Sequence, residues 1–199
     1  MKKTALLILV IGLLLACSSQ REVTRLDTES VTDLSGMWND TDARLVAEAM
    51  IADCLMNPWL AEFMEANDGK KPVVTVGTIR NKTTEHIDTE IFTKNFEREL
   101  NNSRKVTFVA SRDERDEVRE ERYDQQEFAS EETVKRFREE TGADFLLVGA
   151  IKSITDQIEG EKVVFYQTDL ELIDIENNEK AWIGTKKIKK GISQGKWKP

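Results

Sequence analysis

Residues 163–175 read VVFYQTDLELIDI, and the alternation in this stretch decides the fold class. Apolar and polar side chains take turns along it, so an extended strand would collect them on opposite faces. One face would hold Val164, Tyr166, Thr168, Leu170 and Leu172, and the other would hold Gln167, Asp169 and Glu171. Such alternation predicts a strand that packs one face on a core and leaves the other in water, as antiparallel sheets do.

Two further strand-like runs surround this stretch. Residues 145–154 precede it, with Glu159-Gly160 between them, and residues 180–192 follow it after Asn177-Asn178-Glu179. Both connections have the residue types of hairpin turns. The C-terminal part of the chain is therefore predicted to form three strands joined by turns.

The segment before these strands contains two helical patterns. Apolar residues recur at three- and four-residue steps after a cap at Asn39 or Asp40, and Pro58 ends this helix or starts a second piece. The apolar positions of the first helix are Leu45, Val46, Ala49, Met50, Ala52 and Leu55. The free thiol of Cys54 is interpreted as a packed side chain. A second helix is predicted from its N-cap Asp88, with Ile91, Phe92, Phe96 and Leu100 on its buried side.

Strands and a third helix complete the pattern. A β-branched strand is predicted over residues 73–79, and a short one over 106–110. The charge run of residues 112–127 has the pattern of a solvated helix or a mobile excursion. Ser130 is placed to cap a further helix that directs two apolar side chains inward and ends at Gly142; those side chains are Val134 and Phe137. These elements predict one domain of the α/β (α+β) class over residues 38–199, with a mixed, largely antiparallel sheet of about four to five strands flanked by helices.

The N-terminus has the pattern of a signal peptide. Lys2 and Lys3 precede a short apolar run. Residues 1–16, which include this run, are predicted to be a signal peptide that is removed. The sequence Leu14-Leu15-Ala16-Cys17 matches the lipobox of bacterial lipoproteins, in which the chain is cut between Ala16 and Cys17. Cys17 would then carry S-diacylglycerol and N-palmitoyl groups, and two or more acyl chains make a stable anchor. The alternative is an ordinary cleaved signal with a free cysteine.

Residues 17–37 are polar and aperiodic beyond the lipidated cysteine, so they are predicted to be a flexible tether. Ser18 stands where an aspartate would retain enterobacterial lipoproteins in the inner membrane, which favours the outer membrane and its periplasmic face. Without residues 1–16, the net charge becomes −10, from the −8 of the whole chain.

Composition narrows the possible chemistry. The chain has 29 basic and 37 acidic residues, which disfavours nucleic-acid binding. Its single histidine, His86, excludes metal sites that need several histidines. The sequence also contains no phosphate-binding loop and no nucleophile motif. We therefore expect no cofactor, no metal and no catalytic residue. A basic cluster near the C-terminus could bind anionic lipid or glycan, or could protect a sheet edge from pairing; it consists of Lys186, Lys187, Lys189 and Lys190.

Several phrases in the sequence resemble the LpoB family of penicillin-binding protein activators. They are residues 40–48, 53–55, 58–60, 78–83, 87–90, 142–147 and 170–174. The resemblance implies a core similar to the N-terminal domain of TolB and to the curli-secretion lipoprotein. It also implies a non-catalytic outer-membrane lipoprotein that faces the periplasm, binds a class A penicillin-binding protein as a monomer and activates peptidoglycan synthesis.

The tether departs from that pattern, because residues 18–37 contain no proline and span at most roughly 70 Å. The alternative function is a structural or assembly lipoprotein of the TolB or curli-secretion type, and a third is a cell-wall enzyme with acidic residues in a deep pocket. For the activator, the predicted partner-binding region is the loop between the first strand and its helix, formed by Asn81, Lys82, Thr83, Thr84 and Glu85.

Overall fold

The computed structural model describes residues 22–135 and 139–193. The chain divides into two units, one that ends at Val31 and one that starts at Thr32. Cys17, on which the anchor prediction depends, lies outside the described residues. Within the described ranges, no helix combines the length and the apolar character that a membrane crossing requires.

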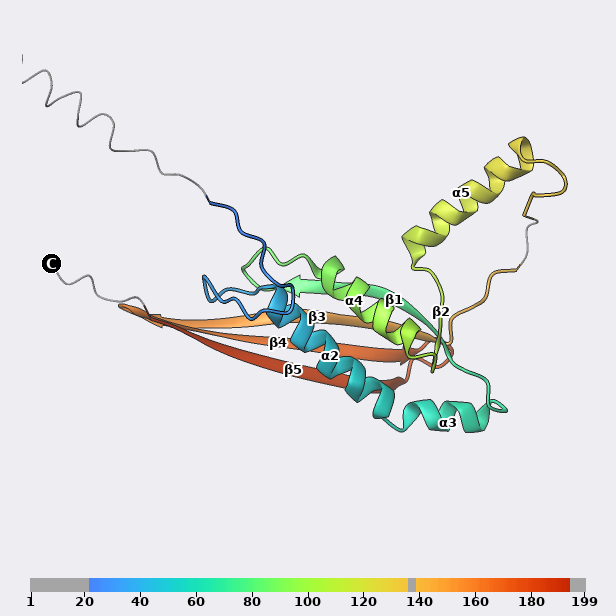
Figure 1. Cartoon of the computed structure of the whole chain (residues 1–199). Helices are drawn as coiled ribbons and strands as arrows, with labels where there is room; N and C mark the ends of the chain where they lie inside the picture. The colour runs from blue at the N-terminus through green and yellow to red at the C-terminus, as the bar shows by residue number, and fades with distance from the viewer. Residues whose placement is uncertain (1–21, 136–138, 194–199) are drawn as a thin grey trace, which may run out of the picture. The chain divides into compact units, whose positions relative to one another are not determined.

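The second unit is a mixed sheet with helices, which confirms the predicted class (Figure 1). Its elements are α2 (Asp40–Met56), α3 (Trp59–Ala66), β1 (Val73–Lys82), α4 (Thr89–Asn102), β2 (Thr107–Phe108), α5 (Arg112–Phe128), β3 (Phe145–Ile158), β4 (Glu161–Asp174) and β5 (Lys180–Ser193). The five strands lie in the order β2-β1-β3-β4-β5. β1 is parallel to β2 and to β3, whereas β3, β4 and β5 form the predicted antiparallel meander.

The two turns of the meander fall where the sequence places them. Gly160 has φ 82° between β3 and β4, and Asn178 has φ 64° between β4 and β5. Both residue types tolerate this left-handed conformation, glycine because it lacks a Cβ and asparagine because its side chain bonds locally. These turns set the register of the long strands, in which Leu147 faces Leu172 and Leu172 faces Trp182.

One face of the sheet is buried under two helices. α2 and α4 pack beside each other on that face, as Figure 1 shows. β4 directs the predicted set of side chains into this core, and all of them are buried: Val164, Tyr166, Thr168, Leu170 and Leu172. The alternate side chains of β4 are half-buried on the opposite face. The sheet is therefore covered on one side, as the alternation predicts.

Hydrogen bonds at the N-termini of α2 and α4 determine where these helices begin, and one further hydrogen bond joins α2 to the sheet. Asn39 caps α2 in a capping box with Asp42, and Asp88 caps α4 by accepting a hydrogen bond from the backbone N of Glu90. Trp182 on β5 donates its indole N–H to the carboxylate of Asp53 on α2 at 2.8 Å.

Cys54 on α2 is buried in the same core as a free thiol, and burial raises its pKa to about 12. It therefore stays protonated at neutral pH and packs like a small apolar side chain, as predicted.

Three residues placed on the apolar sides of the predicted helices are exposed, and Ala52 is one of them. Leu45 is 43% exposed and Ile91 is 60% exposed. In α2 the buried positions run through Val46, Met50 and Cys54, and in α4 they follow Phe92 in four-residue steps. Leu45 and Ile91 each directly precede a buried residue, whereas Ala52 directly follows the buried Ile51. Each exposed residue thus lies about 100° around the helix from a buried neighbour, beyond the edge of the buried stripe.

The first two strands have lengths that differ from the prediction. β1 continues to Lys82 instead of ending at Ile79, because it pairs with β3 as far as Lys82 opposite Lys152. A bulge between Val76 and Ile79 absorbs a shift in this pairing. β2 is limited to Thr107–Phe108, which pair with the first two residues of β1.

The charge run forms α5, whereas the helix predicted from Ser130 is absent from the described part of residues 130–142. α5 begins with a capping box of Ser111 and Glu114, and no α5 side chain is buried. After α5 the hydroxyl of Ser130 contacts that of Thr133 at 2.8 Å, and this local bond competes with helix formation. Of the two side chains predicted to face inward there, Val134 is half-buried and Phe137 lies outside the described residues.

Gly149 on β3 tests how closely the meander is packed. A Cβ at this position would overlap the backbone oxygen of Asp169 on β4, so Gly149→Ala must push the two strands apart. We expect it to lower the free energy of unfolding by about 1 to 3 kcal/mol in urea denaturation. Gly191→Ala on β5 is the control, because no atom lies within 4 Å of its added Cβ, and it should stay within about 0.5 kcal/mol of the wild type. Equal effects would show that β3 and β4 are not in close contact at Gly149.

Candidate functional site

The predicted contact loop is held in shape by its own side chains. Asn81, near the end of β1, donates from its amide to the backbone oxygen of Glu85 at 2.8 Å. Its side-chain oxygen accepts from the backbone N and the hydroxyl of Thr83 at 2.9 and 2.8 Å. The hydroxyl of Thr83 in turn accepts from the backbone N of Glu85 at 3.1 Å. These bonds satisfy the backbone of a short loop, and they restrict its conformation.

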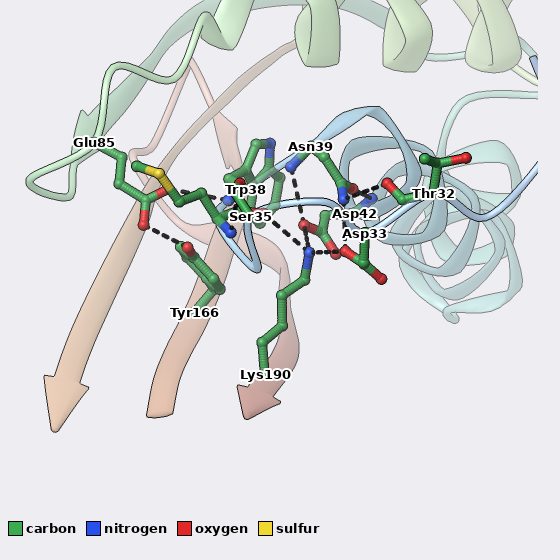
Figure 2. A network of polar contacts seen from close by, with 10 residues as sticks. Thr32, Asp33, Ser35, Trp38, Asn39, Asp42, Glu85, Tyr166 and Lys190 are labelled. Carbon is green, nitrogen blue, oxygen red and sulfur yellow. Dashed lines mark hydrogen bonds and ion pairs between the residues drawn. The ribbon is translucent and has the colours of Figure 1, made fainter. Parts of the chain in front are cut away.

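Glu85 fastens the loop to the rest of the domain (Figure 2). One carboxylate oxygen accepts from the hydroxyl of Tyr166 on β4 at 2.5 Å, and the other accepts from the backbone N of Trp38 at 3.0 Å. The rings of Trp38 and Tyr166 meet edge to face, with centroids 5.5 Å apart. Burial and the hydrogen bond to Glu85 raise the pKa of Tyr166, so its hydroxyl remains a donor at physiological pH.

Trp38 belongs to a segment that a lysine clamps onto the sheet. This segment, residues 33–38, is called the strap below. Lys190 on β5 contacts Asp33 and Asp42, in each case at 2.6 Å, and donates to the backbone oxygen of Met37 at 3.0 Å. Figure 2 shows its ammonium group between the two carboxylates. The strap is thus joined to β5 through Lys190 and to the contact loop through Trp38.

Electrostatics support the clamp. Burial alone would lower the pKa of Lys190, but the hydrogen bonds and charges of Asp33 and Asp42 outweigh it and raise that pKa. The hydrogen bonds from Lys190 and Asn39 lower the pKa of Asp33. The lysine side chain is only 11% exposed, and that of Asp42 is 5% exposed, so this ion pair is largely removed from water. Such a pair is costly to break from one side, because the partner charge stays buried.

The structure divides the predicted basic cluster between the two faces of β5. Lys186 and Lys190 face the side of α2, where Lys186 borders a hollow with Asp42, Glu48 and Ile188. Strand alternation places Lys187 and Lys189 on the other face. β5 is the last strand of the sheet, so it is an edge strand. Lysines along it are therefore placed as expected if the cluster protects a sheet edge from pairing with another chain.

The five residues of the predicted contact region have different roles in the structure. Lys82 and Thr84 are exposed to solvent. Thr83 and Glu85 are half-buried and hold the loop, while Asn81 is exposed but engaged in the loop's own hydrogen bonds. The neighbouring His86 is exposed, as predicted for a surface histidine. The region is therefore a rigid polar corner that offers two side chains outward.

The residues that fasten this corner do not stand out in the sequence pattern. They are Asp33, Trp38, Tyr166 and Lys190, and they are distant from the loop in sequence. One signal was present: Tyr166 falls on the core-facing side of β4, where a buried hydroxyl needs a partner. Nothing in the sequence pattern names Glu85 as that partner.

The sequence matches the family model described as peptidoglycan-synthase activator LpoB over residues 42–188, which is 147 of its 199 residues. Among curated proteins, no match was found.

Three solved structures illustrate the similarity. The LpoB C-terminal domain from Escherichia coli is 19% identical, with 70% of this chain and 96% of that chain covered and a TM-score of 0.35. The LpoB C-terminal domain from Salmonella enterica is 18% identical, with 67% and 94% covered and a TM-score of 0.35. The PelC dodecamer from Paraburkholderia phytofirmans is 21% identical, with 63% and 76% covered and a TM-score of 0.33.

The clamp can be tested by comparing two adjacent lysines. Lys190→Met removes the cation between Asp33 and Asp42, and leaves Asp42 buried without its ion pair. We expect thermal or urea unfolding to show a loss of about 1 to 3 kcal/mol. Lys189→Met removes an exposed lysine from the opposite face and should stay within about 0.5 kcal/mol of the wild type. Equal stability of the two variants would contradict the clamp.

The pH profile of the Lys190→Met variant gives an independent readout. The folded-state pKa of Asp33 lies below 3.8, so its contribution is present above that pH and is lost as the pH falls through the folded value. The folded-state pKa of Lys190 lies above 10.5, so its contribution is present below that pH and is lost as the pH rises through the folded value. The stability difference between wild type and variant should therefore be largest between these limits and shrink outside them. A difference that does not change with pH would show that lost packing, not charge, explains the variant.

Proposed function

Because the chain belongs to the LpoB family of peptidoglycan-synthase activators, we propose that it binds a class A penicillin-binding protein and activates it. The observation that carries this proposal is the family match over residues 42–188, which begins in α2 and ends in β5. The match thus includes the sheet, both covering helices and the contact loop. A chain that matches over its folded domain is expected to use that domain in the way its family does.

The protein would act as a regulator without chemistry of its own. In the corner formed by the loop and the strap, the carboxylate of Glu85 accepts from Tyr166 and Trp38, and that of Asp33 accepts from Lys190 and Asn39. These groups are occupied in holding a surface, which suits recognition of a partner better than proton transfer to a substrate. Rigid presentation of Lys82 and Thr84 lowers the ordering cost of binding.

We further propose that lipids on Cys17 anchor the protein to the outer membrane, with the domain in the periplasm and monomeric. Residues 33–38 are joined to the domain by Lys190 and Glu85, so residues 18–32 separate Cys17 from the strap in the sequence. Fifteen residues span at most about 50 Å. A synthase would therefore have to extend its docking region to within that distance of the anchor. If none does, the short connection favours the alternative, a structural or assembly lipoprotein of the TolB or curli-secretion type.

Cys17→Ala tests the anchor. Without the thiol there is no acceptor for the diacylglyceryl group, so palmitate labelling should disappear and the protein should leave the membrane fraction. The melting temperature of the domain should not change, because the substitution lies outside the folded unit that starts at Thr32. Continued palmitate incorporation by the variant would refute lipidation at Cys17.

Substitution of the two outward side chains tests the contact region. Lys82→Glu combined with Thr84→Arg introduces opposite charge and bulk, and should weaken stimulation of the synthase several-fold in a purified glycan-polymerisation assay. Stability should stay within about 0.5 kcal/mol, since both side chains are exposed. Thr83 is left intact in this design because its hydroxyl holds Glu85.

The matched control for this test lies near the other end of β1. Lys105→Glu with Thr107→Arg makes the same exchanges at two exposed residues, of which Thr107 lies in β2 and Lys105 just before it, and should leave stimulation unchanged. Equal stimulation by both double variants would move the contact region away from the loop. If the unmodified protein fails to stimulate the class A synthase of its own organism, the proposed function itself is wrong.

A further inference from the structure

In the part of the chain that the structure describes, the sheet has one face without a helix, opposite α2 and α4 (Figure 1). This face carries a line of cations. It is called the open face below. The register pairs Lys82 with Lys152, Lys152 with Gln167, and Gln167 with Lys187. Directly paired residues point to the same side of a sheet, so these four side chains form one row across β1, β3, β4 and β5. Neighbouring strands are about 4.8 Å apart, and the row is therefore about 14 Å long.

The assignment of this row to the open face follows from the strand alternation. Ile151 and Thr168 adjoin the row on β3 and β4, and both are buried on the helix side, at 0% and 1% exposure. Their neighbours Lys152 and Gln167 must then point to the opposite side. Tyr166 and Ile188 are paired on the helix side in the same way, one position beyond the row. The row is thus separate from the network around Lys190, which lies on the helix side.

Positive charge exceeds negative charge on this part of the open face. Residues two positions apart on a strand point to the same face, so the open face has a parallel set of paired residues, called a rung, on each side of the row. Arg80 lies in the rung before the row, on β1, and Lys189 lies in the rung after it, on β5. In these three rungs of the described sheet, Asp169 is the one carboxylate against five cations. Burial would raise the pKa of Asp169, but hydrogen bonds from Lys152, Thr185 and Gln167 outweigh it and lower that pKa. The whole chain has a net charge of −8, so a cationic surface on it is a local concentration of positive charge. Such a concentration favours association with a negatively charged partner.

Apolar side chains adjoin the cations. In the rung of Lys189 the open face carries Phe165, which is half-buried, and Ile154, which is 69% exposed. An apolar contact beside a charged rim is the usual composition of a protein–protein interface. An anionic membrane fits less well, because Asp156, Glu159 and Glu161 lie toward the tip of the β3–β4 hairpin and would be repelled by its headgroups.

We propose that the open face docks an acidic polypeptide surface, whose carboxylates meet the row of Lys82, Lys152 and Lys187. This inference rests on the proposed function, and it names the charge of the surface that the synthase would present. Lys82 also belongs to the contact loop, so the loop and the open face form one continuous surface. Charge pairing across this surface would speed encounter and fix orientation, and the apolar pair would exclude water from its centre.

Charge reversal on β5 tests the inference without altering the contact loop. Lys187→Glu with Lys189→Glu is made in the full-length lipidated protein, in detergent, and binding to the purified class A synthase of the same organism is measured at 50 and 300 mM NaCl. We expect binding to weaken at least about tenfold at low salt, and the salt dependence to become flatter than that of the wild type. The melting temperature is measured in parallel and should not change, since both lysines are exposed.

The matched control changes the same net charge at a distance. Lys70→Glu with Lys71→Glu alters two exposed lysines before β1, and its binding should stay within about twofold of the wild type. Wild-type affinity for both double variants, or an equal loss in both, would overturn the open face as the docking surface while the proposed function stands. Absence of binding by the unmodified protein would instead remove the proposed function, and this inference with it.

A vesicle assay separates a membrane from a polypeptide partner. Vesicles of phosphatidylethanolamine with 30% phosphatidylglycerol serve as the probe for the wild type and the Lys187→Glu, Lys189→Glu variant. The inference expects equal vesicle binding by the two proteins. A loss of vesicle binding in the variant, together with unchanged binding to the synthase, would assign the open face to anionic lipid and contradict the inference.

Discussion

One-sided burial of the sheet is the constraint on which the other features of the domain depend. β4 has its core set from Val164 to Leu172 at every second position, and α2 and α4 cover that face. Because the side-chain period of a strand is two, every residue between these positions must face away from the helices. Antiparallel pairing then transfers this division to β3 and β5. The position of Lys152 and Lys187 on the open face is thus a consequence of where Ile151 and Tyr166 are buried.

A second constraint is the ion-pair network at the start of the domain. Lys190 joins the strap to β5 through Asp33, and Glu85 joins the strap to the contact loop through Trp38. The strap, the end of β5 and the loop are therefore joined by short charge-assisted bonds. This arrangement gives the exposed corner at Lys82 and Thr84 a fixed shape before any partner arrives. It also shortens the stretch of sequence between Cys17 and the domain, since the strap belongs to the domain.

Much of the fold could be predicted from the sequence, because the strongest signals are local. The alternation in β4, the turn residues Gly160 and Asn178, and the caps Asn39 and Asp88 each act within a few residues, and the structure confirms them. The prediction failed where a distant contact or a competing local hydrogen bond decides the outcome. β1 extends to Lys82 because β3 offers a partner, and the helix expected from Ser130 has local hydroxyl bonds in its place.

The candidate site was predictable only in part for the same reason. The loop was recognised as polar and fixed at both ends, but its bond to Tyr166 joins residues 81 positions apart. The open-face row likewise cannot be recognised in the sequence, because Lys82, Lys152 and Lys187 become neighbours only through the register of four strands. Their individual exposure could be expected from residue type, whereas their alignment could not.

Site-specific photo-crosslinking in living cells tests the central claim most directly, namely that this domain docks a class A synthase through the loop and the open face. A photoreactive amino acid is placed at position 84, 187 or 98 of the full-length protein, where Arg98 on α4 represents the helix-covered side. The account predicts covalent adducts that contain the synthase from positions 84 and 187, and none from position 98. Adducts with the synthase from position 98 alone, or none from any position in cells where the protein is anchored and folded, would contradict it.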